Sequence, residues 1–492
     1  MDRNLDGKVQ YQLRHKYYHT TAVVGDVLYC WGGNQEGLDK SHDSPTKREC
    51  TSVIDAFNLL SGAWSSQPTS GTPPLGIIGV SCTPISNNIY YFGGWCGHDG
   101  CFHNSLNCLD TCTLQWKELQ PTGDNSVTKR AYGGMIAIGT GSGSEGEPQQ
   151  LLVIGGQGTA TQHHPQFKYD YGAAITNEQS IYNLFSGQWI VPFVSGQCFP
   201  PAEEFIIQKI SYNKGIMHGG LVNDGSYCST DSIYLFQLSH NTINWECLKP
   251  GSVPNDGLWP DARNRHASTI INGVSTSPTL VMIGGVDSDE QLVNECWLLE
   301  TKQYSWIKIP LPDPVTGRFH HTVSSFVVNP NHVFLIIVGG VLVDIGHNVF
   351  GAPLNDSDIT IVVDLIFNDG QWSVGPVLDS HNIPLFYEQI LKERRKELIG
   401  MNECMTDKEK ELQVINESLR HDLQVSRINN QSLQEALLAL ESEKSVLETQ
   451  LLETKTLLTK QKRDQEDSPH SDNAKKLKTD ESVEEKQTMT DG

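Results

Sequence analysis

Residues 318–372 decide the fold. They read RFHHT from 318, an apolar run that ends in VFLIIVGG at 333–340, and then ITIVVDL at 359–365, NDG at 368–370 and Trp372. Apolar runs rich in Val, Ile and Phe, bounded by Gly, Asn and Asp, are typical of short β-strands. A glycine pair at a strand end indicates that no side chain fits there and that another backbone comes close. We therefore expect a small antiparallel sheet from this stretch.

The same order of features occurs six times. The glycine pairs begin at Gly32, Gly93, Gly155, Gly219, Gly284 and Gly339, which are 61, 62, 64, 65 and 55 residues apart. The tryptophans that follow them are Trp64, Trp116, Trp189, Trp245, Trp306 and Trp372. A fixed order at a near-fixed spacing indicates a repeat architecture. One small sheet cannot bury both of its faces, so we expect the repeats to stack radially, with the tryptophans between them.

A glycine pair followed by a tryptophan in each repeat resembles the kelch family, over roughly residues 14–376. The resemblance implies an all-β fold, a six-bladed kelch β-propeller, with one blade from each repeat. The repeats here are longer than the usual ~50 residues, and His218 precedes its glycine pair where an apolar residue is usual. An ordinary β-sandwich with chance glycines is the alternative. No exchanged strand is evident between the ends, so blades one and six are expected to pack directly.

Charge and hydropathy narrow the classes of protein. The 492 residues carry a formal net charge of −22, which argues against general nucleic-acid binding because that needs clustered positive charge. The first 14 residues lack the apolar core of a secretory signal, and the longest apolar run, residues 333–338, is too short to span a bilayer. We therefore expect a soluble, cytoplasmic protein without a membrane or nucleic-acid partner.

The 12 cysteines, without a secretory signal, are expected to be reduced thiols. One segment is dense in metal-ligand side chains, namely Cys96, His98, Cys101, His103, Cys108 and Cys112. A zinc site usually has paired ligands at close spacing, and these spacings are irregular. The same segment also fits the strand–turn–Trp template that ends at Trp116. We therefore predict ordinary packing there, with no metal and no cofactor.

After about residue 385 the apolar period changes to a heptad. One core series is Leu412, Leu419, Ser426, Leu433, Leu440, Leu447 and Thr454, and the other is Asn416, Leu423, Asn430, Leu437, Lys444, Leu451 and Leu458. A narrow apolar seam with Asn at a positions is typical of a parallel two-stranded coiled coil, and a solitary solvated helix is the alternative. The predicted domains are a propeller at 1–380, a helix and parallel coiled coil at 385–463, and a disordered charged tail at 464–492.

The tail carries two basic clusters, at residues 462–463 and 475–478. Their spacing resembles a bipartite nuclear import signal, although basic pairs also arise by chance in solvated tails. The expected location is therefore the cytoplasm, and also the nucleus if this signal works.

Basic residues recur where four repeats begin. They are Lys16, Arg130, Arg263 and Arg318, and Arg265 adds a further charge. In kelch propellers that this chain resembles, such positions and those just after the glycine pair line one face around a central channel. The resemblance therefore places these five residues, with Trp95 and Gln157, around a mouth that would bind an acidic peptide or a C-terminal carboxylate. The alternative is that each basic residue pairs with an acidic residue of a neighbouring blade and supports packing.

A propeller with a dimerising rod predicts a non-enzymatic protein–protein interaction scaffold or adaptor, which binds a partner peptide at the mouth and forms a homodimer. The alternative is a substrate-recognition subunit of a ubiquitin ligase, a role of many kelch proteins. That role usually needs a BTB domain, an F-box or an elongin-binding segment, and only a short helix near residues 385–398 remains a candidate. Nothing specifies the copper site of a galactose-oxidase-like enzyme, and fold alone does not decide function.

Overall fold

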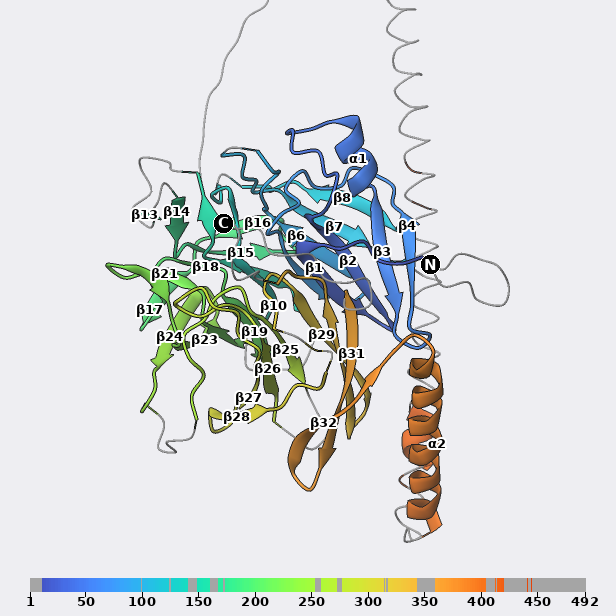
Figure 1. The fold of residues 1–492 in the computed structure, drawn as a ribbon. Helices are drawn as coiled ribbons and strands as arrows, with labels where there is room; N and C mark the ends of the chain where they lie inside the picture. Colours follow the sequence, from blue (N-terminus) through green and yellow to red (C-terminus); the bar gives the residue numbers. More distant parts are fainter. Residues whose placement is uncertain are drawn as a thin grey trace, which may run out of the picture. The chain divides into compact units, whose positions relative to one another are not determined.

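Six antiparallel sheets follow one another along the chain (Figure 1), and the strands of each are hydrogen-bonded in chain order. The first contains β1 (Tyr17–Val24), β2 (Val27–Asn34), β3 (Val53–Asn58) and β4 (Ala63–Pro68). The second contains β5 (Ser81–Ile85), β6 (Asn88–Phe92), β7 (Leu106–Asp110) and β8 (Gln115–Leu119). The third contains β10 (Gly134–Ile138), β11 (Gln150–Ile154), β15 (Gln179–Asn183) and β16 (Gln188–Ile190).

The other three sheets repeat this plan. The fourth contains β19 (Ile206–Ser211), β20 (Lys214–His218), β23 (Ile233–Ser239) and β24 (Thr242–Leu248), and β17 (Phe193–Gly196) pairs parallel with β24 at its edge. The fifth contains β25 (Ala267–Ile271), β26 (Thr279–Ile283), β27 (Cys296–Glu300) and β28 (Ser305–Ile309). The sixth contains β29 (Thr322–Asn329), β30 (His332–Val338), β31 (Thr360–Asn368) and β32 (Gln371–Leu378).

The loops add smaller elements. One small sheet is formed by β13 (Phe167–Asp170), β14 (Ala173–Thr176), β12 (Gln157–Gly158) and β9 (Arg130–Ala131), and another by β18 (Ala202–Glu203), β21 (Leu221–Asn223) and β22 (Tyr227–Ser229). The helices are α1 (Pro45–Thr51) and α2 (Asn382–Glu403). This computed structural model describes residues 11–403, except 99, 124, 140–147, 160–166, 171–172, 253–257, 272–276, 314, 316 and 343–358, and then residues 412, 414–419, 440 and 444.

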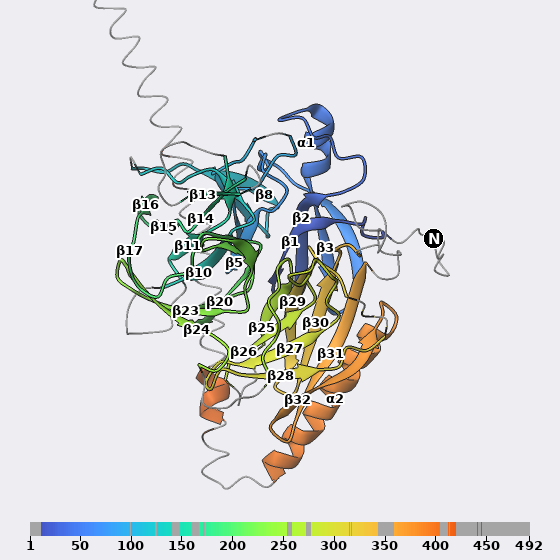
Figure 2. The ribbon, with the colours of Figure 1, turned by 60° about the vertical axis from the view of Figure 1, so that its left-hand side comes forward.

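The first strands of the six sheets surround a common centre (Figure 2). In cyclic order, β1 contacts β5, β5 contacts β10, β10 contacts β19, β19 contacts β25, β25 contacts β29, and β29 contacts β1. The sheets that contain β1 and β29 therefore meet directly, and neither takes a strand from the other.

Each pair of neighbouring sheets encloses its own apolar cluster, because a sheet in a radial stack buries both faces. Each of the six repeat tryptophans packs in a different one of these clusters. From the first–second interface round to the sixth–first interface they are Trp116, Trp189, Trp245, Trp306, Trp372 and Trp64. The prediction that the tryptophans supply apolar area between sheets is confirmed.

The glycine pairs join each sheet to the next. The second glycine of each pair donates its N–H to a backbone carbonyl of the following repeat, at 2.7 to 3.0 Å; the last of these bonds runs from Gly340 back to Lys16. At Gly339, φ is 61° and an added Cβ would lie 2.3 Å from the Lys16 carbonyl oxygen. Only glycine therefore allows the sixth repeat to approach the first so closely.

The helix α2 begins as part of the first of two units, which divide at Lys396 and Glu397. Its residues Ile383 and Ile390 are buried, and Phe386 packs with them against the cluster shared by the first and sixth sheets. Further on, the described residues 412, 414–419, 440 and 444 are helical. No described helix has the length and apolar character needed to cross a membrane.

Candidate functional site at the centre of the ring

Six residues close a hydrogen-bonded circle at the centre. They are Tyr18, Gly79, Tyr132, Glu204, Arg265 and His320, one just before the first strand of each sheet or at its start, and we call them the central ring. Each donates its backbone N–H to the carbonyl of the central-ring residue in the preceding repeat, at 2.8 to 3.1 Å, and Tyr18 donates to His320. All six have φ between 54° and 61°, the left-handed region. This reversal points their side chains away from the sheets.

The central ring lines a cavity of about 180 Å³. A second cavity, of about 270 Å³, is lined by residues of all six first strands and shares His19, Val80, Gly133, Phe205 and His321 with the first. The two cavities therefore follow the axis of the six first strands. Every central-ring residue is partly exposed, whereas His19, Val80, His266 and His321 next to them are buried.

One ion pair dominates the polar chemistry of the ring cavity. The Arg265 Nε donates to Glu204 Oε2 at 2.7 Å, and the Tyr18 hydroxyl donates to Glu204 Oε1 at 3.0 Å. The Tyr18 ring lies 3.5 Å from the His320 ring and 5.0 Å from the Tyr132 ring, measured between centroids. Because Glu204 uses only the Nε of Arg265, the terminal guanidinium nitrogens still face a ligand that could accept their hydrogen bonds.

The histidines around the cavity are neutral near pH 7. Burial, followed by the nearby Lys16 charge, lowers the pKa of His19 to about 3. Burial, followed by the Arg265 charge, lowers the pKa of His320 well below its ordinary value, and burial with the Arg318 charge does the same to the pKa of His321. The lining therefore offers aromatic and neutral imidazole surfaces around a single compensated arginine, and it does not form a strongly basic funnel.

The structure corrects the placement of four residues expected at the mouth. Lys16, Arg130, Arg263 and Arg318 are 8%, 2%, 0% and 0% exposed. Lys16 pairs with Asp55 at 2.5 Å, Arg130 with Glu178 at 2.8 Å, and Arg263 with Glu295 at 2.7 Å. These partners belong to the same repeat, not to a neighbouring blade. Arg318 donates from Nη1 to the Gly339 carbonyl at 3.2 Å. We call these four the buried basic set.

The other expected residues divide in the same way. Arg265 lines the ring cavity. Trp95 is half-buried in bridges to Ile78 and Phe102, and its Nε1 donates to the His98 carbonyl at 2.6 Å. Gln157 is half-buried on β12, between β9 and β14. Of the seven predicted binding residues, only Arg265 lines the described ring cavity.

Sequence reasoning missed Tyr18, Tyr132, Glu204 and His320. They stand two residues after Lys16, Arg130, Ala202 and Arg318, so a fixed offset from the repeat start would have found them. Their chemical diversity hid the offset, since the shared property is a backbone conformation.

Comparison with known proteins agrees with this architecture. The family model described as the KLHDC2/KLHL20/DRC7 Kelch-repeats domain matches residues 8–166. Kelch domain-containing protein 2 from Bos taurus is 23% identical over 316 residues, which cover 62% of this chain and 71% of that protein. The chain is a kelch-repeat protein.

Two other kelch proteins are similar over different extents. Kelch domain-containing protein 3 from Bos taurus is 32% identical over 101 residues, 20% of this chain, so the match spans only about a quarter (24%) of that protein. Kelch domain-containing protein 10 from Rattus norvegicus is 23% identical over 311 residues, 61% of this chain and 67% of that protein. Kelch repeats are generally protein-interaction modules and typically lack enzymatic activity, which agrees with a binding role for the ring cavity.

Proposed function

We propose that this kelch protein is a non-enzymatic interaction scaffold. Its six sheets act as a six-bladed propeller, and the ring cavity binds a partner peptide through a carboxylate. The observation that carries the proposal is Arg265, which is held by Glu204 through one nitrogen while its terminal nitrogens face the cavity. A guanidinium can grip a carboxylate through two parallel hydrogen bonds, and the flanking aromatic rings supply apolar contact.

Size and charge support a narrow ligand. A cavity of about 180 Å³ admits a side chain or a chain end and not a folded domain. Because Glu204 already compensates Arg265, a ligand with one carboxylate matches the site better than a highly acidic segment. The proposed ligand is therefore a C-terminal or side-chain carboxylate on an extended peptide.

The test uses a displayed library of random heptapeptides with free C-termini, selected on the full chain. The enriched peptides are then measured by fluorescence anisotropy against Arg265→Ala and against Lys308→Ala, a control on the outer strand β28. We expect Arg265→Ala to weaken binding about 30-fold, the ~2 kcal/mol of a binding anchor, and Lys308→Ala to leave it unchanged. Equal binding by Arg265→Ala would refute a carboxylate site at the ring.

We further propose that the heptad segment joins two copies in parallel. Leu412, Leu419 and Leu440 are 57%, 61% and 62% exposed on helical backbone, and Asn416 is also exposed, as an uncovered seam would be. The remaining predicted core residues, Leu423, Asn430, Leu433, Leu437, Leu447, Leu451 and Leu458, lie outside the described residues.

Sedimentation of the full chain tests the dimer. Leu412→Glu with Leu419→Glu is expected to convert a dimer at micromolar concentration to a monomer, whereas Glu417→Gln, outside the seam, should have no effect. A monomeric unsubstituted chain at that concentration would rule the dimer out.

One observation favours the ubiquitin-ligase alternative. Leu385 and Leu391 on α2 are 69% and 44% exposed, while other residues of the same helix pack on the sheets. An adaptor contact there predicts that Leu385→Arg with Leu391→Arg removes ligase subunits from affinity-purified complexes without changing peptide binding at the ring. Complexes that lack ligase subunits with the unsubstituted chain would reject this alternative.

A further inference from the structure

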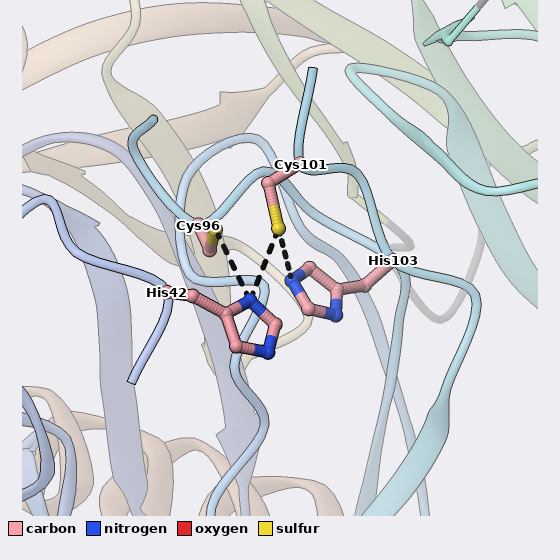
Figure 3. Close-up of side chains that lie close together, drawn as sticks. All are labelled: His42, Cys96, Cys101 and His103. Carbon is pink, nitrogen blue, oxygen red and sulfur yellow. Dashed lines mark hydrogen bonds between the residues drawn. The ribbon is translucent and has the colours of Figure 1, made fainter. Parts of the chain in front are cut away.

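Four metal-ligand side chains from two repeats converge beside α1 (Figure 3). His42 comes from the loop before α1 in the first repeat, and Cys96, Cys101 and His103 come from the loop after the second glycine pair. One ligand atom from each lies within 4.8 Å of all the others. The His42 Nδ1 is 3.1 Å from Cys101 Sγ and 3.9 Å from Cys96 Sγ, and the His103 Nε2 is 3.6 Å from Cys101 Sγ.

These separations match a tetrahedral zinc centre. With Zn–S near 2.3 Å and Zn–N near 2.0 Å, the sulfur–nitrogen edges of a tetrahedron are about 3.6 Å. Thiolate and imidazole ligands favour zinc over the hard cations magnesium and calcium. We propose that His42, Cys96, Cys101 and His103 form a structural Zn²⁺ site that links the first repeat to the second.

The loops that carry the ligands are held by a buried lysine. Lys47 of α1 is 1% exposed, and its Nζ donates to the carbonyls of Ser41 at 2.9 Å, His42 at 3.4 Å and Cys96 at 2.5 Å. One ammonium group thus fixes the backbone on both sides of the cluster. Two thiolates neutralise a divalent ion, so the loaded site tolerates this nearby charge.

The turn from Cys96 to Cys101 is fixed independently. The Cys96 N–H donates to the Cys101 carbonyl at 3.1 Å, and the Cys101 N–H donates to the His98 carbonyl at 3.3 Å. The His98 Nδ1 lies 3.0 Å from Cys96 Sγ, where its N–H would support a thiolate from outside the ligand set. This geometry positions both sulfurs toward the imidazoles.

This site differs from the metal site rejected on sequence spacing. Cys108 lies on β7 with its Sγ 3.4 Å from Asn88 Oδ1, and Cys112 is exposed in the turn after β7; neither belongs to the cluster. His42 supplies the fourth ligand from 54 residues before Cys96. The prediction of no metal weighed only the local segment and could not include this residue.

The first test measures metal in the full chain, purified without chelators. We expect one zinc per chain by elemental mass spectrometry. After zinc is exchanged for Co²⁺, we expect the visible absorption of tetrahedral cobalt with a thiolate-to-metal band. Both readouts use the unsubstituted chain, so they do not depend on the folding of a variant.

Matched variants locate the site. Cys96→Ser with Cys101→Ser should abolish zinc binding, whereas Cys112→Ser, an exposed cysteine of the same repeat, should retain it. Lys47→Met should weaken zinc affinity about tenfold, since it loosens the ligand loops without removing a ligand. Zinc that persists in the double variant, or an unsubstituted chain without zinc and with a Cys96–Cys101 disulfide in peptide maps, would overturn the proposal. Neither result bears on peptide binding at the ring.

Discussion

Arg263 and Arg265 are two residues apart in the fifth repeat, and their surroundings are opposite. The Arg263 side chain is 1% exposed and pairs with Glu295 inside its own repeat, whereas the Arg265 side chain is 27% exposed and faces the ring cavity beside Glu204. The difference arises from the backbone, because Arg265 has a φ of 59°. The same residue type therefore serves packing at one position and is available for recognition at the other. The buried basic set and the central ring extend this contrast to the other repeats.

The largest predicted effect falls on the buried basic set. Arg130→Ala leaves Glu178, whose side chain is 9% exposed, without its cation. Breaking a buried pair in this way is expected to cost about 3–5 kcal/mol of unfolding free energy, measured by urea denaturation. The loss for Arg263→Ala should be smaller, because Glu295 keeps Lys308 at 2.6 Å. Arg130→Ala with Glu178→Ala should recover part of the loss, and an unchanged midpoint for Arg130→Ala alone would break the comparison.

Acid should weaken the fold through its buried histidines. Burial, with help from Lys16 and Arg263 respectively, lowers the pKa of His19 and of His218 from 6.5 to about 3. The unfolded chain then binds more protons between pH 6.5 and 3, so stability falls as pH falls. The pKa values of His266, His320 and His321 are lowered in the same direction.

One carboxyl group opposes this trend. Burial, followed by the Glu204 charge, raises the pKa of Glu203 to about 8, so its contribution to stability is lost as pH rises through 8 and is regained on acidification. Five histidines outweigh one glutamate, and we expect the unfolding free energy to fall by about 3 kcal/mol from pH 6.5 to 5.5. Urea midpoints across this range check the prediction, and a flat profile would contradict it.

The glycine that joins the ends of the ring gives the next effect. Gly339→Ala is expected to cost about 2–3 kcal/mol, since the new methyl group meets the Lys16 carbonyl in a left-handed conformation. Gly370→Ala is the matched control, because its φ is 82° with nothing within 4 Å of the added Cβ, and it should cost about 1 kcal/mol. Equal losses in thermal denaturation would show that the close approach is unimportant.

The smallest predicted stability effect belongs to the central ring. Arg265→Ala removes a partly exposed ion pair and should cost about 1 kcal/mol. Glu204 keeps the Tyr18 hydroxyl in that variant, and the backbone circle is unaffected. Thermal denaturation of Arg263→Ala and Arg265→Ala side by side sharpens the comparison, and a larger loss for Arg265→Ala would reverse it.

The repeats were predictable because their signals are local. The glycine pairs and tryptophans follow from sterics and burial, and the Asp369–Gly370 turn from its two left-handed residues, with φ of 51° and 82°. The facing of Arg130 or Arg318 was not predictable, because a basic residue at a repeat start suits either a ligand or an internal partner. That choice depends on Glu178 and Gly339, which lie 48 and 21 residues further along the chain.

The convergence of His42 with Cys96 was hidden for a related reason. Ligand spacing is informative only when the ligands lie on one local element, and here two repeats supply them. The heptad was visible as a period, yet its partner is not encoded in any single position.

The closed circle of backbone hydrogen bonds also constrains how this protein can change over time. A linear repeat array gains or loses a unit at an end, and each remaining unit keeps its neighbours. In this molecule Tyr18 bonds to His320 and Gly340 bonds to Lys16, so no repeat is terminal. Duplication or loss of one repeat would misalign every junction at once, whereas insertions in the loops leave the junctions intact. Variation is therefore channelled into loop length, as the differing spacings of the six glycine pairs record.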